Sequence, residues 1–262
     1  MATRGRGRGR GLLVATSVAK PGVKESANHE NGSAVTLQEI TQSIRRLDIE
    51  PDDDQILPSC DLIKQYIQTE VHMGEIANLI YGMCLKDRDF AVPAGKLINA
   101  LQNIDVDGMK LRTSFLSLMQ KDFLEKDKLR ESSNEKFLSL VAFLCQTFGT
   151  VRLANGEPML VLTTPVFQCL DAIATDGQEE EIECLVYQLQ CHGKLLEEKT
   201  PQEMLKLMQK VRQAIVSHKT SARVRCMLLE LLETWYNKWQ PLSTATSNFY
   251  ADLFSESLLQ DS

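Results

Sequence analysis

Apolar residues at helical spacing run through most of this 262-residue chain. The clearest stripe follows the i, i+3, i+4, i+7 pattern of one helix face and consists of Phe137, Leu140, Val141, Leu144, Cys145 and Phe148. Similar stripes occupy residues 76–84, 97–104, 111–119, 182–189, 205–215 and 224–235. No stretch shows the alternation of β-branched residues that is typical of strands. The sequence therefore predicts an all-α fold.

Turn and start signals divide the stripes into helix pairs. Asn155-Gly156 and Asp176-Gly177 are turn dipeptides, and Thr200-Pro201 places a capping hydroxyl before a proline at a first helical position. The pairs repeat at roughly 40 residues, which is the period of HEAT-type arrays. Since one pair buries its stripe only against the next, we expect a HEAT-like α-solenoid of about five helical hairpins.

The N-terminal part differs from the rest. Residues 1–33 are rich in Arg, Gly, Ser and Asn without an apolar period, so we expect a disordered Arg/Gly-rich arm. Residues 34–57 are predicted to form a short helix, through Leu37, Ile40 and Ile44, followed by an acidic, proline-containing linker. Residues 58–262 are predicted to form the HEAT-like body, which Pro58 begins.

Charge is distributed unevenly along the chain. The net charge is −6, but residues 1–24 carry six cations and no acid, so the remainder carries −12. An acidic body is not a general phosphate clamp, although a local basic patch or the arm could still bind RNA. The longest apolar runs fall far short of the roughly 20 residues of a membrane helix, so no membrane association is expected.

Cysteine use and targeting signals favour an intracellular protein. The seven cysteines form no C-x-x-C pair and several lie on apolar helix faces, which is typical of a reduced compartment. The start of the chain resembles a signal or transit peptide, with basic residues at Arg4–Arg10 and apolar residues within Leu12–Ala19. The apolar run is short, however, and glycines between the arginines oppose an amphipathic helix. We expect a cytoplasmic protein, and a nuclear pool stays open.

No catalytic motif occurs. The chain lacks the G-x-x-x-x-G-K-[ST], H-E-x-x-H and G-x-S-x-G patterns, and the C-x6-C-H spacing of Cys184, Cys191 and His192 is unusual for zinc. We therefore expect no enzyme activity, no metal and no cofactor.

Two basic segments are candidate binding sites. The arm repeats Arg and Gly through Arg4, Arg6, Arg8 and Arg10, a pattern that binds RNA by charge and guanidinium stacking. A second group lies in the otherwise acidic body and is a candidate contact for an acidic partner or for RNA: Lys206, Lys210, Arg212, Lys219, Arg223 and Arg225. The alternative for both is a solvated, solubilising surface.

Several strings resemble the middle domain of the eukaryotic translation initiation factor 4G family. They are Asp89–Leu97, Val141–Phe148, Asn155–Met159 with Pro165–Leu170, and Met227–Glu233 followed by Trp239. The third resembles the small stand-alone members, which include partners of the histone stem-loop-binding protein, the cap-binding complex and poly(A)-binding protein. The resemblance covers residues 58–255 and leaves out the arm.

The resemblance implies a five-repeat HEAT-like solenoid and a non-catalytic adaptor in mRNA translation. Its implied partners are translation initiation factors or a DEAD-box RNA helicase, together with an mRNA-binding protein. A homodimer stays open. The alternative is a direct RNA-binding protein that uses the Arg/Gly arm and the basic patch.

Overall fold

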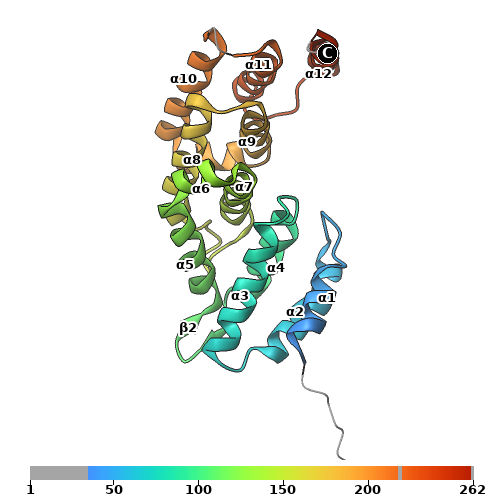
Figure 1. Cartoon of the computed structure of the whole chain (residues 1–262), viewed down its shortest axis with the longest axis vertical. Helices are drawn as coiled ribbons and strands as arrows, with labels where there is room; N and C mark the ends of the chain where they lie inside the picture. Colours follow the sequence, from blue (N-terminus) through green and yellow to red (C-terminus); the bar gives the residue numbers. More distant parts are fainter. Residues whose placement is uncertain (1–34, 218–219, 261–262) are drawn as a thin grey trace, which may run out of the picture. The chain divides into compact units, whose positions relative to one another are not determined.

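The computed structural model describes residues 35–217 and 220–260, with side chains as far as Leu253 (Figure 1). Contacts divide the chain into two units, and the larger one contains residues 35–217 and 220–260. The disorder expected for the arm lies outside the described residues, as do Arg4, Arg6, Arg8, Arg10 and Lys219. All the elements described for the chain belong to the larger unit.

The described residues are almost entirely helical. They contain a 3-10 helix, η1 (Leu160–Leu162), and a hairpin of β1 (Asp105–Val106) and β2 (Met109–Lys110). The twelve α-helices are α1 Leu37–Ile44, α2 Asp53–Tyr66, α3 Glu70–Cys84, α4 Ala91–Leu101, α5 Leu111–Leu124, α6 Lys126–Ser132, α7 Asn134–Thr150, α8 Thr163–Asp176, α9 Glu179–Lys199, α10 Pro201–Val216, α11 Ala222–Tyr236 and α12 Thr244–Gln260. The predicted all-α class is confirmed.

The helices pack as five consecutive hairpins. α1 packs on α2, α3 on α4, α5 and α6 on α7, α8 on α9, and α10 on α11. The second helices of the hairpins, α2, α4, α7, α9 and α11, each contact the next along the series (Figure 1). α12 packs on α11. The predicted HEAT-like α-solenoid of about five hairpins is confirmed.

Helix α7 lies at the centre of the core. All six residues of its predicted stripe, Phe137 to Phe148, are at most 1% exposed. α7 contacts both α4 and α9 within the row of second helices. Gly149 allows the close approach to α9, because a Cβ there would lie 2.2 Å from Nδ1 of His192. The most periodic stripe of the sequence is thus the most completely buried.

The stripe predicted for residues 205–215 starts one residue too late, although its Met208 and Val211 are buried as predicted. Leu205 is 43% exposed, so its assignment to the inward face is wrong. The buried residues of α10 keep the i, i+3, i+4, i+7 spacing and are Met204, Leu207, Met208 and Val211. Since successive helical residues are about 100° apart, a one-residue shift of the stripe moves Leu205 to the solvent side.

The segment expected to be an acidic linker begins a helix instead. Asp52 caps α2: its Oδ1 accepts a hydrogen bond from the Gln55 backbone N (2.8 Å), and the Gln55 side chain accepts one from the Asp52 backbone N (3.0 Å). Carboxylates in a first turn are also favoured by the helix dipole. Pro58 lies inside α2, and Ile56 belongs to the core. The boundary at residue 58 is therefore too late, since α1 and α2 are part of the body.

Two local features differ from the sequence analysis. Asp107 and Gly108 have φ of 52° and 86°, the pair of positive values of a type I′ hairpin turn, so a short β-hairpin forms where no strand was expected. Thr200 precedes α10 with Pro201 at the first helical position, as predicted. Its hydroxyl, however, donates to the Leu196 carbonyl (2.8 Å) and does not cap α10.

Candidate partner-binding surfaces

The predicted basic patch lies on the fifth hairpin. Lys206, Lys210 and Arg212 are on α10, and Arg223 and Arg225 are in the first turns of α11. The structure thus brings five of the six residues to one pair of helices, whereas Lys219 lies outside its described part. What these residues can bind depends on whether nearby carboxylates already balance their charges.

Both lysines of the patch that the structure describes face a carboxylate. Nζ of Lys206 lies 2.7 Å from Oε1 of Glu203, one turn earlier on α10. Nζ of Lys210 lies 3.2 Å from Oδ2 of Asp171 on α8. The Lys206–Glu203 pair is exposed and contributes little stability, whereas the Lys210–Asp171 pair is partly buried. They nevertheless balance two of the charges that the sequence analysis assigned to partner contact.

Arg223 joins α11 to α9. Its Nε lies 2.7 Å from Oε1 of Glu179, and its Nη2 lies 2.5 Å from Oε1 of Glu183. Only 15% of its side chain is exposed. The contacts give Arg223 a packing role that sequence spacing alone did not reveal. Arg225 donates from Nη1 to the carbonyl of Thr220 (2.5 Å) and so holds the turn before α11.

Arg212 forms the most exposed aromatic arrangement of the patch. Its guanidinium carbon lies 5.1 Å from the ring centre of Trp235 and 5.5 Å from that of Tyr236. Nη2 donates to the Tyr236 hydroxyl (2.6 Å), and Tyr236 is 65% exposed. Arg, Tyr and Trp are the residue types that dominate binding hot spots, and guanidinium and aromatic faces also stack on bases.

Trp239, which follows the fifth hairpin, packs against α9 of the fourth. Its indole Nε1 donates to Oε2 of Glu197 (2.7 Å), and the Nε1 of Trp235 donates to Oε1 of the same carboxylate (3.0 Å). A Cβ on Gly193 would lie 2.5 Å from the Trp239 ring, so the ring rests directly on α9. Lys238 and Trp239 both have positive φ, 58° and 59°, a strained conformation that this packing must stabilise.

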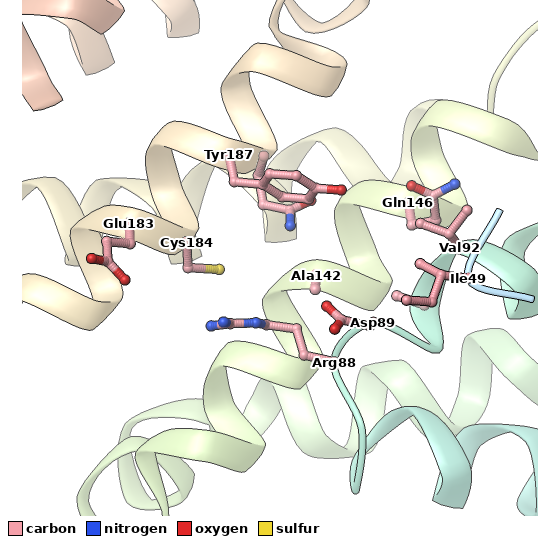
Figure 2. Close-up of a pocket in the computed structure, with 11 residues that line it drawn as sticks. Ile49, Arg88, Asp89, Val92, Ala142, Gln146, Glu183, Cys184 and Tyr187 are labelled. Atoms are coloured by element: carbon pink, nitrogen blue, oxygen red, sulfur yellow. The ribbon is translucent and has the colours of Figure 1, made fainter. Parts of the chain in front are cut away.

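A cavity of about 210 Å³ lies against the row of second helices (Figure 2). Its walls come from the turn after α1, the turn before α4, and helices α4, α7 and α9. Ile49 (63% exposed) and Tyr187 (52% exposed) are its most open apolar residues. The lining residues are Ile49, Arg88, Asp89, Ala91, Val92, Ala142, Gln146, Glu183, Cys184, Tyr187 and Gln188.

Burial shifts the pKa values of the cysteine and the tyrosine of the cavity. Burial raises the pKa of the Cys184 thiol to about 11, although Arg88 opposes the shift, so the thiol is protonated at neutral pH. Burial also raises the pKa of the Tyr187 hydroxyl. A reactive cysteine needs a lowered pKa and access to solvent, and Cys184 is only 3% exposed. The thiol and the phenol of the cavity are therefore not activated as nucleophiles.

The cavity could not be predicted from the sequence. Its residues come from three helices and two turns, and spacing along the chain cannot show that these segments meet. Tyr187 carried one usable signal, because it lies on α9 beside the buried stripe of Ile182, Leu185 and Leu189 but outside it. An aromatic residue outside the inward stripe marks an exposed face that can bind a partner.

Residues 35–217 and 220–260 contain no group of three or more His, Cys, Asp or Glu side chains arranged to hold a metal ion. Cys184 is buried, Cys191 is exposed, and His192 hydrogen-bonds Gln146 (3.1 Å), so this trio does not converge. None of the described helices combines the length and apolarity needed to span a bilayer.

The fold defines the general class, an all-helical HEAT-like repeat domain. The MIF4G domain matches residues 39–238, which is most of the chain and includes α1 and α2. The chain belongs to the MIF4G domain family. The resemblance to the middle domain of initiation factor 4G is thereby confirmed, with a start in α1 rather than at residue 58.

Curated relatives agree with this assignment. The chain is 32% identical over 228 residues to the CBP80/20-dependent translation initiation factor of Xenopus tropicalis, a match that covers 86% of this chain and 39% of that protein. It is 29% identical over 190 residues to MIF4G domain-containing protein B of Danio rerio, a match that covers 70% of this chain and 85% of that protein. The Homo sapiens MIF4G domain-containing protein is 28% identical with the same coverage. The chain thus spans about two fifths of the length of the first of these relatives.

Proposed function

We propose that this chain is a non-catalytic adaptor in mRNA translation, which links an mRNA-bound protein to the translation initiation machinery. The observation that carries the proposal is the match to a translation initiation factor over 86% of the chain. HEAT-like arrays act through extended surfaces, and the cavity residues offer binding groups without an activated nucleophile. The proposed activity is therefore surface recognition.

Two kinds of partner follow from an adaptor role. One is a translation initiation factor or a DEAD-box RNA helicase, and the other is a protein already bound to mRNA. We place this activity in the cytoplasm, and fractionation of cells would show whether a nuclear pool exists. Sedimentation of the purified chain would show whether the adaptor is a monomer or a homodimer.

A tethering assay tests the adaptor function. The chain is fused to an RNA coat protein and recruited to coat-protein stem-loops in a luciferase mRNA, in a cell-free translation extract. We expect severalfold more luciferase per mRNA than with the coat protein alone. The matched control is the Leu144→Asp fusion, in which a charge replaces a side chain that is 1% exposed. Equal output from the chain and the coat protein would refute the proposal.

Direct RNA binding is the second candidate. The observation that favours it is the guanidinium of Arg212 against the rings of Trp235 and Tyr236, an arrangement on which bases could stack. Anisotropy of a fluorescein-labelled 20-nucleotide poly(U) strand at increasing salt separates the two candidates. Direct RNA binding requires tight binding by the isolated chain and a steep loss of affinity with salt. A pull-down from cytosol with and without RNase shows whether natural partners bind the chain directly or through RNA.

A further inference from the structure

We propose that the cavity of Figure 2 docks an extended segment of a partner protein, in which an apolar side chain lies next to a lysine or arginine. This inference rests on the proposed adaptor function and names the kind of segment that the adaptor would hold. Three independent features support it: an amide without a hydrogen-bond partner in the described residues, an apolar opening of the size of one side chain, and a carboxylate excess beside that opening.

The amide belongs to Gln188. This residue is 3% exposed and lines the cavity. Its side chain forms no hydrogen bond with any residue in the part of the chain that the structure describes. Its amide atoms are not among the fully buried, unpaired side-chain atoms of the described residues, so water in the cavity reaches them and a ligand would replace that water. Since the amide carries both donors and an acceptor, it matches the N–H and C=O of a peptide backbone.

The opening fits one apolar side chain. Ile49 and Tyr187 are both more than half exposed at the cavity, and Ala142 on α7 is 2% exposed in its wall. The volume of about 210 Å³ is below the roughly 300–1,000 Å³ of typical small-molecule sites. A single leucine, isoleucine or phenylalanine of a partner therefore suits it better than a cofactor. Docking would remove the exposed apolar surface of Ile49 and Tyr187 from water.

The charge beside the opening determines which residue of the partner segment can lie next to the docked apolar side chain. A second, more polar hollow shares Arg88 and Asp89 with the cavity and also contains Glu135 and Glu180. Asp89, Glu135 and Glu180 are exposed, and none of them takes part in an ion pair within the described residues. With Asp87 they make four carboxylates against the two cations of this hollow, Lys86 and Arg88. The excess of carboxylates attracts a basic side chain and repels phosphate.

Arg88 does not reverse this conclusion. Figure 2 shows its side chain extending toward Cys184 and Glu183, whereas the Asp89 carboxylate lies on the side of Ile49 and Gln146. The carboxylate that borders the apolar opening is therefore Asp89. A basic residue next to the docked apolar side chain would meet Asp89 first, whereas an acidic residue there would meet a like charge.

A peptide selection tests the inference directly. A nonapeptide library displayed on phage is selected against the immobilised full chain, and recovered peptides are synthesised with a blocked C-terminus. We expect sequences with Lys or Arg beside Leu, Ile or Phe. Binding of these peptides to the purified chain, measured by fluorescence anisotropy, should weaken at least tenfold in Tyr187→Ala and in Gln188→Ala. The matched control is Tyr236→Ala, which removes an exposed tyrosine of α11 and should change the affinity less than twofold.

A charge variant tests the choice of a basic residue. Asp89→Asn with Glu180→Gln should weaken binding at least threefold and flatten its salt dependence. The inference is overturned if the selection yields no binding peptide or if sequences with an acidic residue beside the apolar one dominate. It is also overturned if every peptide binds the Tyr187→Ala variant with unchanged affinity, or if poly(U) RNA competes with the peptides for the cavity. A failed selection with an active tethered chain refutes this inference alone, whereas an inactive tethered chain that still binds the peptides refutes the adaptor function alone.

Discussion

Arg130 forms a two-point ion pair with Glu181. Its Nε lies 2.5 Å from Oε1 and its Nη2 lies 2.8 Å from Oε2 of the carboxylate. Arg130 is on α6 and Glu181 is in the first turn of α9, so the pair joins the third hairpin to the fourth. Glu181 is 2% exposed, and its Oε2 also accepts a hydrogen bond from the backbone N of Gln178 (2.8 Å). This carboxylate thus caps α9 and anchors α6 at the same time.

Removing the charge of Arg130 should destabilise the fold. We expect Arg130→Met to lower the free energy of unfolding by about 3–5 kcal/mol, because Glu181 would keep a buried charge without its partner. Urea denaturation followed by circular dichroism measures the change. The control is Lys128→Met, which breaks an exposed pair with Glu125 and should cost less than about 1 kcal/mol. Similar losses in the two variants would contradict the assignment.

The contact between Gly193 and Trp239 gives a second prediction. We expect Gly193→Ala to destabilise the chain by about 1–3 kcal/mol, because the added Cβ would lie 2.5 Å from the indole ring and would displace it. Tryptophan fluorescence should report the displacement as a shift in emission. Thermal unfolding measures the loss of stability.

A double substitution shows that the ring is the cause. In a Trp239→Ala background the added methyl group meets no ring, and alanine is a better helix former than glycine by about 1 kcal/mol. Gly193→Ala should therefore become neutral or stabilising there. If Gly193→Ala is equally destabilising in both backgrounds, the ring does not rest on α9 as described.

A third prediction concerns the inward and outward faces of two helices. Leu144 of α7 is 1% exposed and Leu205 of α10 is 43% exposed. Leu144→Asp should cost several kcal/mol and abolish the cooperative unfolding transition, because it buries a carboxylate and removes core packing. Leu205→Asp should leave the melting temperature within a few degrees. Equal melting of the two variants would mean that the faces are misassigned.

The same two residues show what the sequence could predict. The stripe through Leu144 is long and has buried neighbours on every side, so its face was predicted correctly. In α10 two apolar residues, Met204 and Leu205, follow one another where the stripe starts. Spacing alone does not show which of them faces the core. The choice is made by packing against α8 and α11, which is a tertiary property.

Elements without a strong period were missed for a related reason. α2 carries three aspartates at its start and a proline inside, features that favour a linker when read locally. Burial of Ile56, Cys60 and Ile63 stabilises the helix against those preferences. The candidate site was predicted least well, because ion pairs such as that of Arg223 and the walls of the cavity join residues far apart in the chain.

His192 gives a pH-dependent prediction. Burial lowers its pKa to about 4 from the ordinary value of 6.5, and the positive charge of Arg152 adds to the effect. Its Nε2 lies 3.1 Å from Oε1 of Gln146 and its ring lies against Gly149. The folded chain therefore keeps His192 neutral below pH 6.5, whereas the unfolded chain binds a proton there. The stability that this group contributes is complete above pH 6.5 and is lost as the pH falls toward 4.

Unfolding in urea at pH 7 and pH 5 measures this effect. The contribution of His192 should fall by about 2 kcal/mol across that interval, since one pKa unit corresponds to about 1.4 kcal/mol. The control is His192→Gln, which keeps a hydrogen-bonding group but does not titrate, so the difference in stability between the two chains should change with pH. A difference that is constant from pH 7 to pH 5 would contradict a neutral, buried imidazole.

The basic patch gives the last prediction, because the structure separates residues that the sequence had grouped. Arg223→Glu would place a third carboxylate beside Glu179 and Glu183, where the arginine now lies within 2.7 Å of both. We expect a loss of several kcal/mol in the free energy of unfolding, measured in urea. Lys206→Glu, at a position where 64% of the side chain is exposed, should cost less than about 1 kcal/mol.

Binding should follow the opposite order from stability. If the fifth hairpin docks an acidic segment or RNA, reversing Lys206, Lys210 and Arg212 to Glu weakens that complex and flattens its salt dependence, while the helical circular dichroism and melting of the chain stay near those of the parent. Poly(U) RNA and polyglutamate are the two probes, and each is titrated at low and moderate salt. Loss of the RNA complex alone supports direct RNA binding, and loss of the polyglutamate complex alone supports protein docking. Unchanged binding of both probes would mean that these cations are only solvated surface groups. The ion pairs of Lys206 with Glu203 and of Lys210 with Asp171 would then be the only role of the two lysines.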